Sequence, residues 1–426
     1  MNVISRSKAS YPGRVQRALL LSAVVVSFVL PAQSQRGQRG GVPFELPEGN
    51  GKETVGKVCT VCHELGENIS RNNFNRADWG FVVQRMIAHG APLPKDQAPM
   101  VADYLAKSFP ASGQPAGVKV TGPVEARIGE IPVPDGMDVE AKAFAADGSV
   151  VLSAGRSLLA LYDPKKGEFT KYRFNSRAGA HDADVDKEGN IWYVAGEFIG
   201  RINPKTGEVT EYPMPDPKAR ALHDLAIAPN GNIFFTMSRG NMVGRIEPKT
   251  GKVTLAAIPT PNADPYDIQV NSEGIPYFTE FYTDKIARID PDTMEIREYT
   301  LAHPGARAKR LGFTPDGLIY YNDFARGYLG QLDPQTGATK EWPSPGGRKS
   351  KPYGFDVVGN VVWYAETNTQ PNVLVRFDTK TERFQTWLMP TPGERIHYLR
   401  SAPDGKTVWI GRYTVNGSVL DKVDVN

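Results

Sequence analysis

The feature that most constrains this fold is a repeat of roughly 40 residues that fills most of the chain. The segment 199–207, Ile-Gly-Arg-Ile-Asn-Pro-Lys-Thr-Gly, returns almost unchanged at 243–251 and in weaker form three more times. Within each unit a short turn separates two strand-like runs, and its glycine can supply the positive φ that a tight turn requires. Alignment on these turn glycines gives seven units, marked by Gly148, Gly189, Gly231, Gly274, Gly317, Gly359 and Gly405.

The two ends of the repeat region complement each other. The last unit lacks a clear fourth strand, and one strand-like segment, residues 126–134, stands alone before the first unit. If this segment completes the last unit, the ring closes and no sheet edge is left open. We therefore expect an all-β seven-bladed propeller over residues 123–426.

The N-terminus predicts export. Basic residues precede an apolar run over 18–30, and small residues follow it, which is the order found in a secretory signal. An uncleaved anchor is the alternative, but the run is short of the ~20 residues that a spanning helix needs. We expect a signal peptide over 1–34, a disordered segment over 35–45, and a periplasmic or secreted protein without a membrane span after cleavage.

The chain has only two cysteines, and both lie in the sequence Cys59-Thr60-Val61-Cys62-His63. A redox-active pair is one interpretation of C-x-x-C. The histidine directly after the second cysteine instead indicates covalent haem c, with thioether bonds to Cys59 and Cys62 and with His63 as the proximal iron ligand.

Residues 46–110 have helical periodicity in three stretches, at 53–63, 77–89 and 95–109, and predict a small all-α domain around the haem. Candidates for the sixth iron ligand are Met86, Met100 and His89. Residues 111–122 follow, rich in Pro, Gly, Ala and Ser, and predict a linker.

A resemblance selects among the iron ligands. The region is similar to the small cytochrome c domains that partner periplasmic sulfite and amine dehydrogenases. This resemblance implies that Met86 is the distal ligand, with Met100 as the alternative, and that the protein exchanges electrons with a redox partner protein. The residues that carry it are Trp79, Val82, Arg85, Met86, Gly90, Ala91, Pro92, Leu93, Val101, Tyr104 and Leu105.

One position recurs at the start of the innermost strand of every blade, near the mouth of the central channel. Three of the six histidines of the chain fall on it, and they could bind substrate, hold a second metal ion, or act as acid and base. Polar residues also line propeller channels without any function, and the aspartates that follow three of these positions could instead join neighbouring blades. The ring comprises Glu140, His181, His223, Tyr266, Lys309, Tyr353 and His397.

The propeller resembles the streptogramin (virginiamycin B) lyase family, as in Asp264-Pro265-Tyr266-Asp267-Ile268 and the strand 284–289. That family opens a cyclic depsipeptide by elimination, with a magnesium ion and with histidines and glutamates at the channel mouth. The resemblance maps the family's last-blade histidine onto His397. The chain departs from the family pattern at Glu140, Tyr353, Arg395 and Arg412 or Tyr413, so carboxylates that would hold magnesium are missing.

These observations lead to one main function and two alternatives. The near balance of 50 basic and 47 acidic residues does not favour nucleic acid as a partner. The main prediction is a periplasmic electron-transfer protein, part of an oxidoreductase or itself one, whose ring residues His181, His223 and His397 bind a small-molecule substrate or a second cofactor. The alternatives are a lyase-like propeller with an appended haem domain and a non-catalytic docking propeller.

Overall fold

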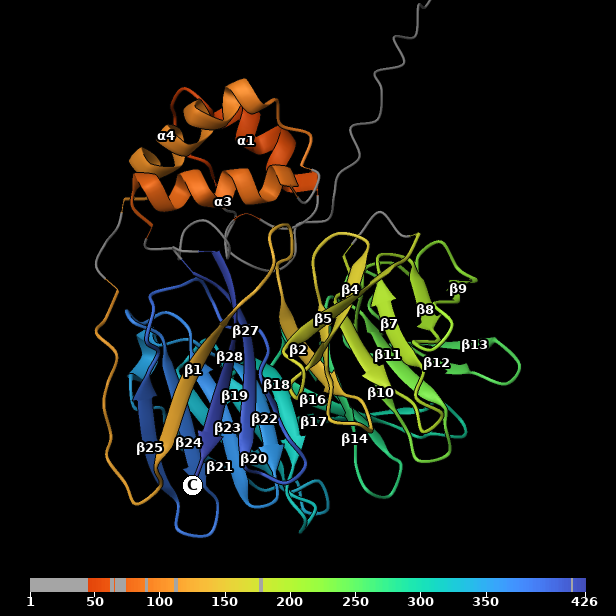
Figure 1. Ribbon diagram of the computed structural model, residues 1–426. Helices are drawn as coiled ribbons and strands as arrows, with labels where there is room; N and C mark the ends of the chain where they lie inside the picture. The colour runs from red at the N-terminus through yellow and green to blue at the C-terminus, as the bar shows by residue number, and fades with distance from the viewer. Residues whose placement is uncertain are drawn as a thin grey trace, which may run out of the picture. The chain divides into compact units, whose positions relative to one another are not determined.

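The computed structural model describes residues 45–61, 65, 74–88, 91–110, 114–175, 179–414 and 417–426. The predicted signal peptide and the segment 35–44 lie outside these ranges, as do Cys62, His63 and His89. The described residues form a small helical unit and a β-propeller, each of which is labelled in Figure 1.

The helical unit contains the three helices that the sequence predicts, with one shorter than expected. Helix α1 spans Lys52–Val58 and continues as a 3₁₀ turn over Cys59–Val61. Helix α3 spans Arg76–Ala88, and α4 spans Ala98–Ser108 after a 3₁₀ turn at Lys95–Gln97. Cys59 therefore lies at the end of the first helix, where regular α-helical bonding has stopped.

A compact apolar core holds these helices together. Trp79 of α3 is 1% exposed and packs with Val83, Val101 and Leu105. The sequence also caps α3, because the side chain of Asn75 accepts a hydrogen bond from the backbone N–H of Ala77 at 2.8 Å. The unit is thus a packed fold with its own core.

The propeller prediction is confirmed: the strands form seven four-stranded sheets. In the last blade the N-terminal strand β1 pairs with the C-terminal strand β28, so the two ends of the region close the ring as expected. The first four blades are β2 (Glu140–Phe144), β3 (Val150–Ser153), β4 (Leu158–Asp163), β5 (Glu168–Arg173); β6 (Asp182–Val185), β7 (Ile191–Ala195), β8 (Phe198–Ile202), β9 (Val209–Pro213); β10 (Leu222–Ile227), β11 (Ile233–Met237), β12 (Met242–Glu247), β13 (Lys252–Ala257); and β14 (Pro265–Val270), β15 (Pro276–Glu280), β16 (Lys285–Ile289), β17 (Ile296–Thr300).

The remaining three blades follow the same order, and the last one contains both ends of the region. They are β18 (Ala308–Phe313), β19 (Ile319–Asp323), β20 (Tyr328–Leu332), β21 (Thr339–Pro343); β22 (Pro352–Val358), β23 (Val361–Glu366), β24 (Val373–Asp378), β25 (Arg383–Leu388); and β26 (Arg400–Ser401), β27 (Thr407–Thr414), β28 (Gly417–Val425), β1 (Ala126–Pro132).

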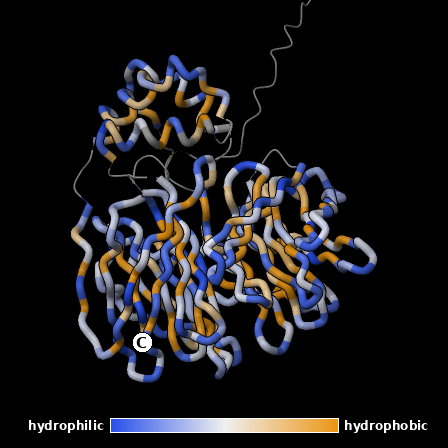
Figure 2. Tube along the Cα trace, in the orientation of Figure 1, coloured by the Kyte–Doolittle hydropathy of each residue, from blue (hydrophilic) through white to orange (hydrophobic). Residues whose placement is uncertain are grey.

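The repeat has a simple packing reason. Every residue of the second strands β7, β11, β15 and β19 is buried, because each blade is covered on both faces by its neighbours. Figure 2 shows these hydrophobic stretches along the blades, with hydrophilic residues in the loops. The repeated glycine of the third strand makes room for an aromatic ring: a Cβ at Gly200 would lie 2.0 Å from the Tyr193 ring. The turn glycines all have positive φ, as their place in the repeat predicts.

The segment predicted as a linker is attached to the propeller where the structure describes it. Val120 donates to and accepts from Thr386 of β25, and the side chain of Gln385 bonds the backbone of Val124. Residues 115–124 therefore cover the outer edge of the sixth blade, which would otherwise be an open sheet edge.

Candidate functional site

The innermost strands pair irregularly with their neighbours at the point where they carry the ring residues. In β10, β14, β18 and β22 the register shifts within the first four residues, where the ring residue lies. A bulge of this kind rotates the strand locally and aims a side chain out of the regular pleat. In the last blade the innermost strand β26 has only two residues, and His397 lies in the segment before it.

The predicted ring exists as a chain of neighbouring side chains. The ring centroids of His181 and His223 are 5.0 Å apart, and those of His223 and Tyr266 are 3.8 Å apart. The hydroxyl groups of Tyr266 and Tyr353 are in contact, and the ring centroid of Tyr353 lies 5.0 Å from that of His397. Of the three histidines, His223 is buried, His397 is half-buried and His181 is exposed.

His397 forms a pair with Glu140, the ring residue of the neighbouring first blade. Its Nδ1 lies 2.7 Å from Glu140 Oε1, while Glu140 Oε2 accepts a hydrogen bond from Lys142 at 3.0 Å. Burial alone would raise the pKa of Glu140, but Lys142 and His397 hold it well below its ordinary value. Because an ionised carboxylate can only accept, Nδ1 of His397 is the donor, and in the neutral form of the imidazole the lone pair is then on Nε2.

Beside His397 stands a pair of phenols. Tyr353 is 6% exposed, and burial raises its pKa to about 12, while burial also raises the pKa of Tyr266 well above its ordinary value. Both phenols are therefore protonated at neutral pH and can donate hydrogen bonds.

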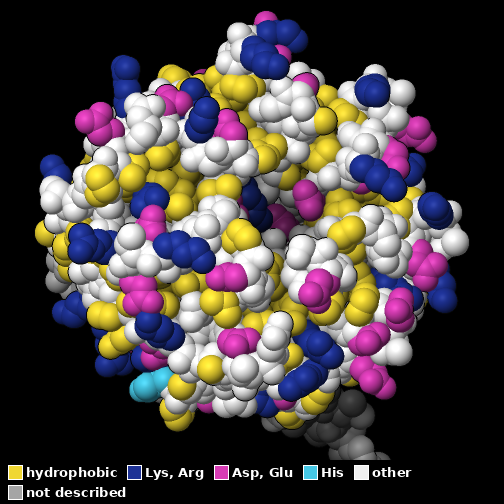
Figure 3. Space-filling view, turned by 90° about the horizontal axis from the view of Figure 1, so that it is seen from below, with side chains coloured by type: hydrophobic (Ala, Val, Ile, Leu, Met, Phe, Trp, Pro, Cys, Tyr) yellow, Lys and Arg dark blue, Asp and Glu magenta, His cyan; other side chains and the backbone are white. Residues whose placement is uncertain are grey.

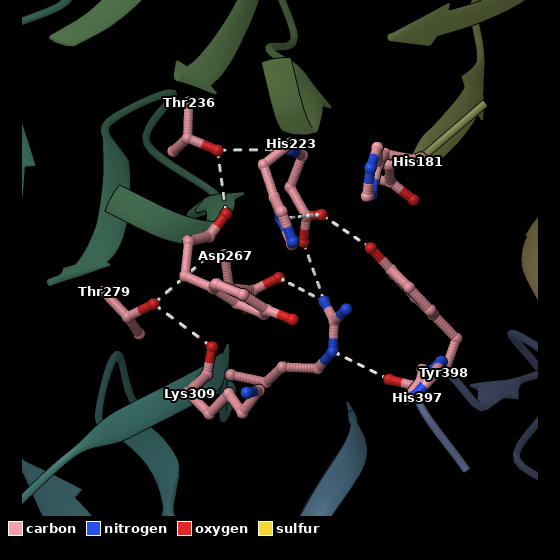
Figure 4. Close-up of polar contacts among 12 residues, drawn as sticks. His181, His223, Thr236, Asp267, Thr279, Lys309, His397 and Tyr398 are labelled. Carbon is pink, nitrogen blue, oxygen red and sulfur yellow. Dashed lines mark hydrogen bonds and ion pairs between the residues drawn. The ribbon is translucent and has the colours of Figure 1, made fainter. Parts of the chain in front are cut away.

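A buried layer of charged residues, absent from the predicted ring, supports it from beneath. Arg310, which is 1% exposed, binds Asp224 at 2.7 Å and Asp267 at 2.9 Å, and its Nε donates to the backbone oxygen of His397 at 3.0 Å. Figure 4 shows Asp267, His223, His397 and Tyr398 around these contacts, which are drawn as dashed lines. A single side chain of the fifth blade thus connects the third, fourth and seventh blades.

Asp224 contacts several residues of that layer. It accepts a hydrogen bond from Tyr398 at 2.6 Å, and its Oδ1 lies 2.8 Å from His223 Nδ1, although the two are not aligned for a hydrogen bond. Burial opposes ionisation, but Arg310 and His223 hold the pKa of Asp224 well below its ordinary value.

The other two aspartates behave differently, and they do join blades as one alternative predicted. Asp182 accepts from the backbone N–H of Leu225 at 3.3 Å, and Asp267 accepts from Leu311 at 2.8 Å, each in the next blade. Burial raises the pKa of Asp182 to about 7 and that of Asp267 to about 8, with Asp224 adding to both.

Sequence reasoning missed Arg310, Tyr398 and Lys142. Arg310 carried a signal, since it follows the ring residue Lys309 and so places two adjacent basic residues near the start of the innermost strand of the fifth blade. Figure 3 shows the molecule from below, and at the centre of that face basic and acidic side chains line a hollow.

The positions that depart from the family pattern have structural partners of their own. Arg412 is 2% exposed, binds Asp421 at 2.6 Å and also contacts Glu130 of β1. It therefore helps to hold β1, the strand that completes the last blade, in place. Across the described ranges, no three His, Cys, Asp or Glu side chains are arranged to hold a metal ion. The second metal ion, which the sequence offered as one possible role of the ring histidines, stays a prediction.

The candidate haem residues are only partly described. Cys62 and His63 lie outside the described residues, whereas Cys59 is half-buried and packs, like Met100, against the helical core. Met86 is half-buried on α3. Within the described part of this unit, the buried indole Nε1 of Trp79 has no hydrogen-bond partner. No helix in the described ranges has the length and apolar character needed to cross a membrane.

Comparison with solved structures shows the same fold in several lyases. A streptogramin B lyase structure is 21% identical, with a TM-score of 0.64, over 71% of this chain and 98% of that one. Virginiamycin B lyase from Staphylococcus aureus is 20% identical, with a TM-score of 0.61, over 71% of this chain and 99% of that one. A catalytically inactive variant of that enzyme with quinupristin is 22% identical, with a TM-score of 0.61, over 70% and 99% of the two chains.

At the level of sequence, no curated protein matches the chain. The pattern of the virginiamycin B lyase family does match it, over residues 169–421, which is more than half of its length and includes six of the seven ring positions. The chain belongs to the virginiamycin B lyase family.

Proposed function

We propose that the channel mouth of the propeller is a lyase-type site in which His397 is the general base. The observation that carries this proposal is the 2.7 Å contact between His397 Nδ1 and Glu140. A carboxylate in this place fixes the tautomer of the imidazole and leaves Nε2 as the proton acceptor. Family membership supports the reaction class, because lyases share this fold.

The remaining groups have roles in such an elimination. Nε2 of His397 takes a proton from a carbon atom of the substrate, and Glu140 stabilises the imidazolium that forms. Tyr353 and Tyr266, whose hydroxyls touch, can donate a hydrogen bond or a proton to the departing oxygen. Arg310 is a positioning residue, since it holds the backbone oxygen of His397 and does not line the mouth.

The reaction class is tested by product analysis. The full chain is incubated with quinupristin, the compound present with the inactive lyase variant, and with trigalacturonate and its methyl ester, which have an oxygen substituent β to each carboxyl group. Products are followed by ultraviolet absorbance and mass spectrometry. An elimination creates a carbon–carbon double bond and adds no water, whereas a hydrolysis adds one water. We expect products of summed mass equal to that of the substrate from at least one compound, and a large loss of rate in Glu140→Gln. A water-added product, or no product from any compound, would contradict the proposal.

We propose as a second function that residues 46–110 carry a covalent haem and pass electrons to a redox partner protein. Cys59, the first cysteine of the C-x-x-C-H sequence, supports this, and so do Met86 and Met100 as candidate ligands. The Nε1 of Trp79, which has no hydrogen-bond partner among the described residues, also fits, because a haem carboxylate could accept its hydrogen bond. Haem supplies one-electron transfer, and this chain would attach it through Cys59 and Cys62, with His63 on the iron.

An optical spectrum and an intact mass of protein made in an exporting host test this second function. We expect covalent haem that Cys59→Ala and Cys62→Ala together abolish; a haem-free mass for the wild-type chain would contradict it. The same preparation tests export to the periplasm or beyond and removal of residues 1–34, both of which remain proposals.

A further inference from the structure

The innermost strand of the first blade carries a buried lysine two residues after the ring residue Glu140. Lys142 is 1% exposed, and its ammonium group has three N–H bonds to donate. It donates to Glu140 Oε2 at 3.0 Å and to the backbone oxygen of His181 at 2.5 Å. The same group lies 2.8 Å from the centroid of the Tyr398 ring, whose face stabilises a cation. Lys142 thus connects the first, second and seventh blades beside the pair of Glu140 and His397.

The side chain of Glu140 lies between this cation and the proposed base. One of its oxygens, Oε2, is bound by Lys142, and the other, Oε1, contacts His397 Nδ1 at 2.7 Å. Burial alone would raise the pKa of Glu140, and Lys142 is the strongest of the groups that lower it. Lys142 therefore both orients this carboxylate toward His397 and contributes most to keeping it ionised.

The charge of Lys142 also decides which imidazole nitrogen of His397 carries a proton. With the ammonium present, Glu140 is a carboxylate and the neutral imidazole keeps its one proton on Nδ1. Without the ammonium, the pair of Glu140 and His397 has an uncompensated buried negative charge, which favours the uptake of one proton. That proton goes either to Nε2 directly or to the Glu140 carboxyl group, which then donates to Nδ1 and leaves the imidazole N–H on Nε2. In both arrangements Nε2 is protonated and does not act as a base.

Further charged and titratable groups face these three residues from the neighbouring blades. Arg310 has its own carboxylate partner, Asp224, at 2.7 Å. Asp182 and His181 are competing sites for a proton: burial raises the pKa of Asp182 to about 7 and lowers that of His181 to about 3, and Lys142 lowers both. An experiment must therefore locate the proton on the imidazole of the base itself. The groups around the three residues comprise His181, Asp182, Asp224, Arg310, Tyr353 and Tyr398.

We propose that Lys142 is a positioning residue of the elimination, which holds Glu140 against His397 and keeps Nε2 of the base free of a proton. This inference rests on the lyase-type function proposed above. Lys142 acts through Glu140 and not on the substrate, because its ammonium group is buried among Glu140, the His181 backbone and the Tyr398 ring. Its replacement by a neutral residue therefore quenches the base without removing any group from the channel mouth.

The test follows the imidazole nitrogens by ¹⁵N NMR on the full chain with ¹⁵N-labelled histidine and without substrate. The chemical shift of each nitrogen shows whether it carries a proton, and the signals of His397 are those missing from His397→Ala. The variants are Lys142→Met and Lys142→Gln, of which the second keeps an N–H donor without the charge and serves if the first fails to fold. Each is also made in a Glu140→Gln background. Lys205→Met, at an exposed lysine in the turn after β8, is the matched control.

We expect His397 of the wild-type chain to carry its proton on Nδ1 at pH 7 and to have a bare Nε2. In both Lys142 variants Nε2 should stay protonated to a pH higher by about one unit or more, whereas Lys205→Met should titrate as the wild type does. In the Glu140→Gln background the shift should be much smaller, because the carboxylate through which Lys142 acts is gone. A proton on Nε2 of the wild type at pH 7, an unchanged titration in a folded Lys142 variant, or an equal shift without Glu140 would overturn the inference.

The pH dependence of product formation separates this inference from the lyase proposal. The acid limb of the rate profile of Lys142→Gln should move upward by the same amount as the NMR titration. If the NMR shift is seen but the wild-type chain forms no unsaturated product, the lyase proposal fails while the control of Lys142 over the imidazole stands. If product forms and a folded Lys142 variant keeps the wild-type profile, the lyase proposal stands and the role of Lys142 is refuted.

Discussion

Replacement of Arg310 by methionine should destabilise the propeller strongly. The change removes a buried ion pair with Asp224 at 2.7 Å, the contact with Asp267 at 2.9 Å, and the hydrogen bond to the His397 backbone. Removing one partner of a buried ion pair costs about 3–5 kcal/mol, because a charge is left without compensation. The pKa of Asp267 is raised to about 8 by burial, so this carboxyl can stay protonated and relieve part of the cost. Asp224 keeps the hydrogen bond from Tyr398 but loses the buried positive charge that holds its pKa down, and we therefore expect a loss of about 3 kcal/mol.

The assay is urea unfolding followed by intrinsic fluorescence, on Arg310→Met and on Arg383→Met side by side. Arg383 is exposed at the start of the outer strand β25, so its replacement controls for the loss of an arginine as such. A difference between the two variants of less than about 1 kcal/mol would refute the reasoning, because that is the range of an ordinary surface ion pair.

Three further changes test other parts of the fold. The pKa of Asp182 is raised to about 7, so the folded state holds a proton that the unfolded chain has released. Its stabilisation is complete below about pH 4 and is lost by about pH 7, and the free energies of unfolding of wild type and Asp182→Asn, measured in urea, should diverge across that window by up to about 1.4 kcal/mol per pH unit. Gly200→Val places a side chain where even a Cβ lies 2.0 Å from Tyr193, and we expect a loss of about 1–3 kcal/mol in thermal unfolding, whereas an unchanged midpoint would contradict the packing argument. Arg412→Met leaves Asp421 buried without its ion-pair partner and should lower the free energy of unfolding by about 3–5 kcal/mol. It should also speed proteolysis within β1, and cleavage at the wild-type rate would contradict the role of Arg412 in holding β1.

The propeller was predictable because its signals are local and repeated. Each turn glycine lies in a short window whose pattern recurs, and the lone strand before the first unit has one place to pair. The ring followed from the same alignment, since equivalent positions of a repeat occupy equivalent positions around the channel. The helices were less sharply defined: regular bonding in the first one ends at Val58, short of the residue that the periodicity suggested.

The charged layer beneath the ring was not predictable in this way. Arg310 and Asp224 are 86 positions apart, and Tyr398 and Asp224 are 174 positions apart, so no periodic pattern connects them. Their pairing depends on which blades face each other across the channel and on how far each side chain reaches. The pair of Glu140 and His397 escaped notice for the same reason, because the two become neighbours only when the ring closes. The attachment of residues 115–124 to β25 depends on hydrogen bonds that a composition of Pro, Gly and Ala does not reveal.

One rate comparison tests most directly whether His397 is the general base of the elimination at the channel mouth. The formation of unsaturated product is measured for wild type, for His397→Ala and for His303→Ala, a histidine on an exposed loop. We expect His397→Ala to lower the rate by roughly 10²–10⁴-fold, because a general base is lost, and His303→Ala to leave it unchanged. A folded His397→Ala variant that forms product at the wild-type rate would contradict the account.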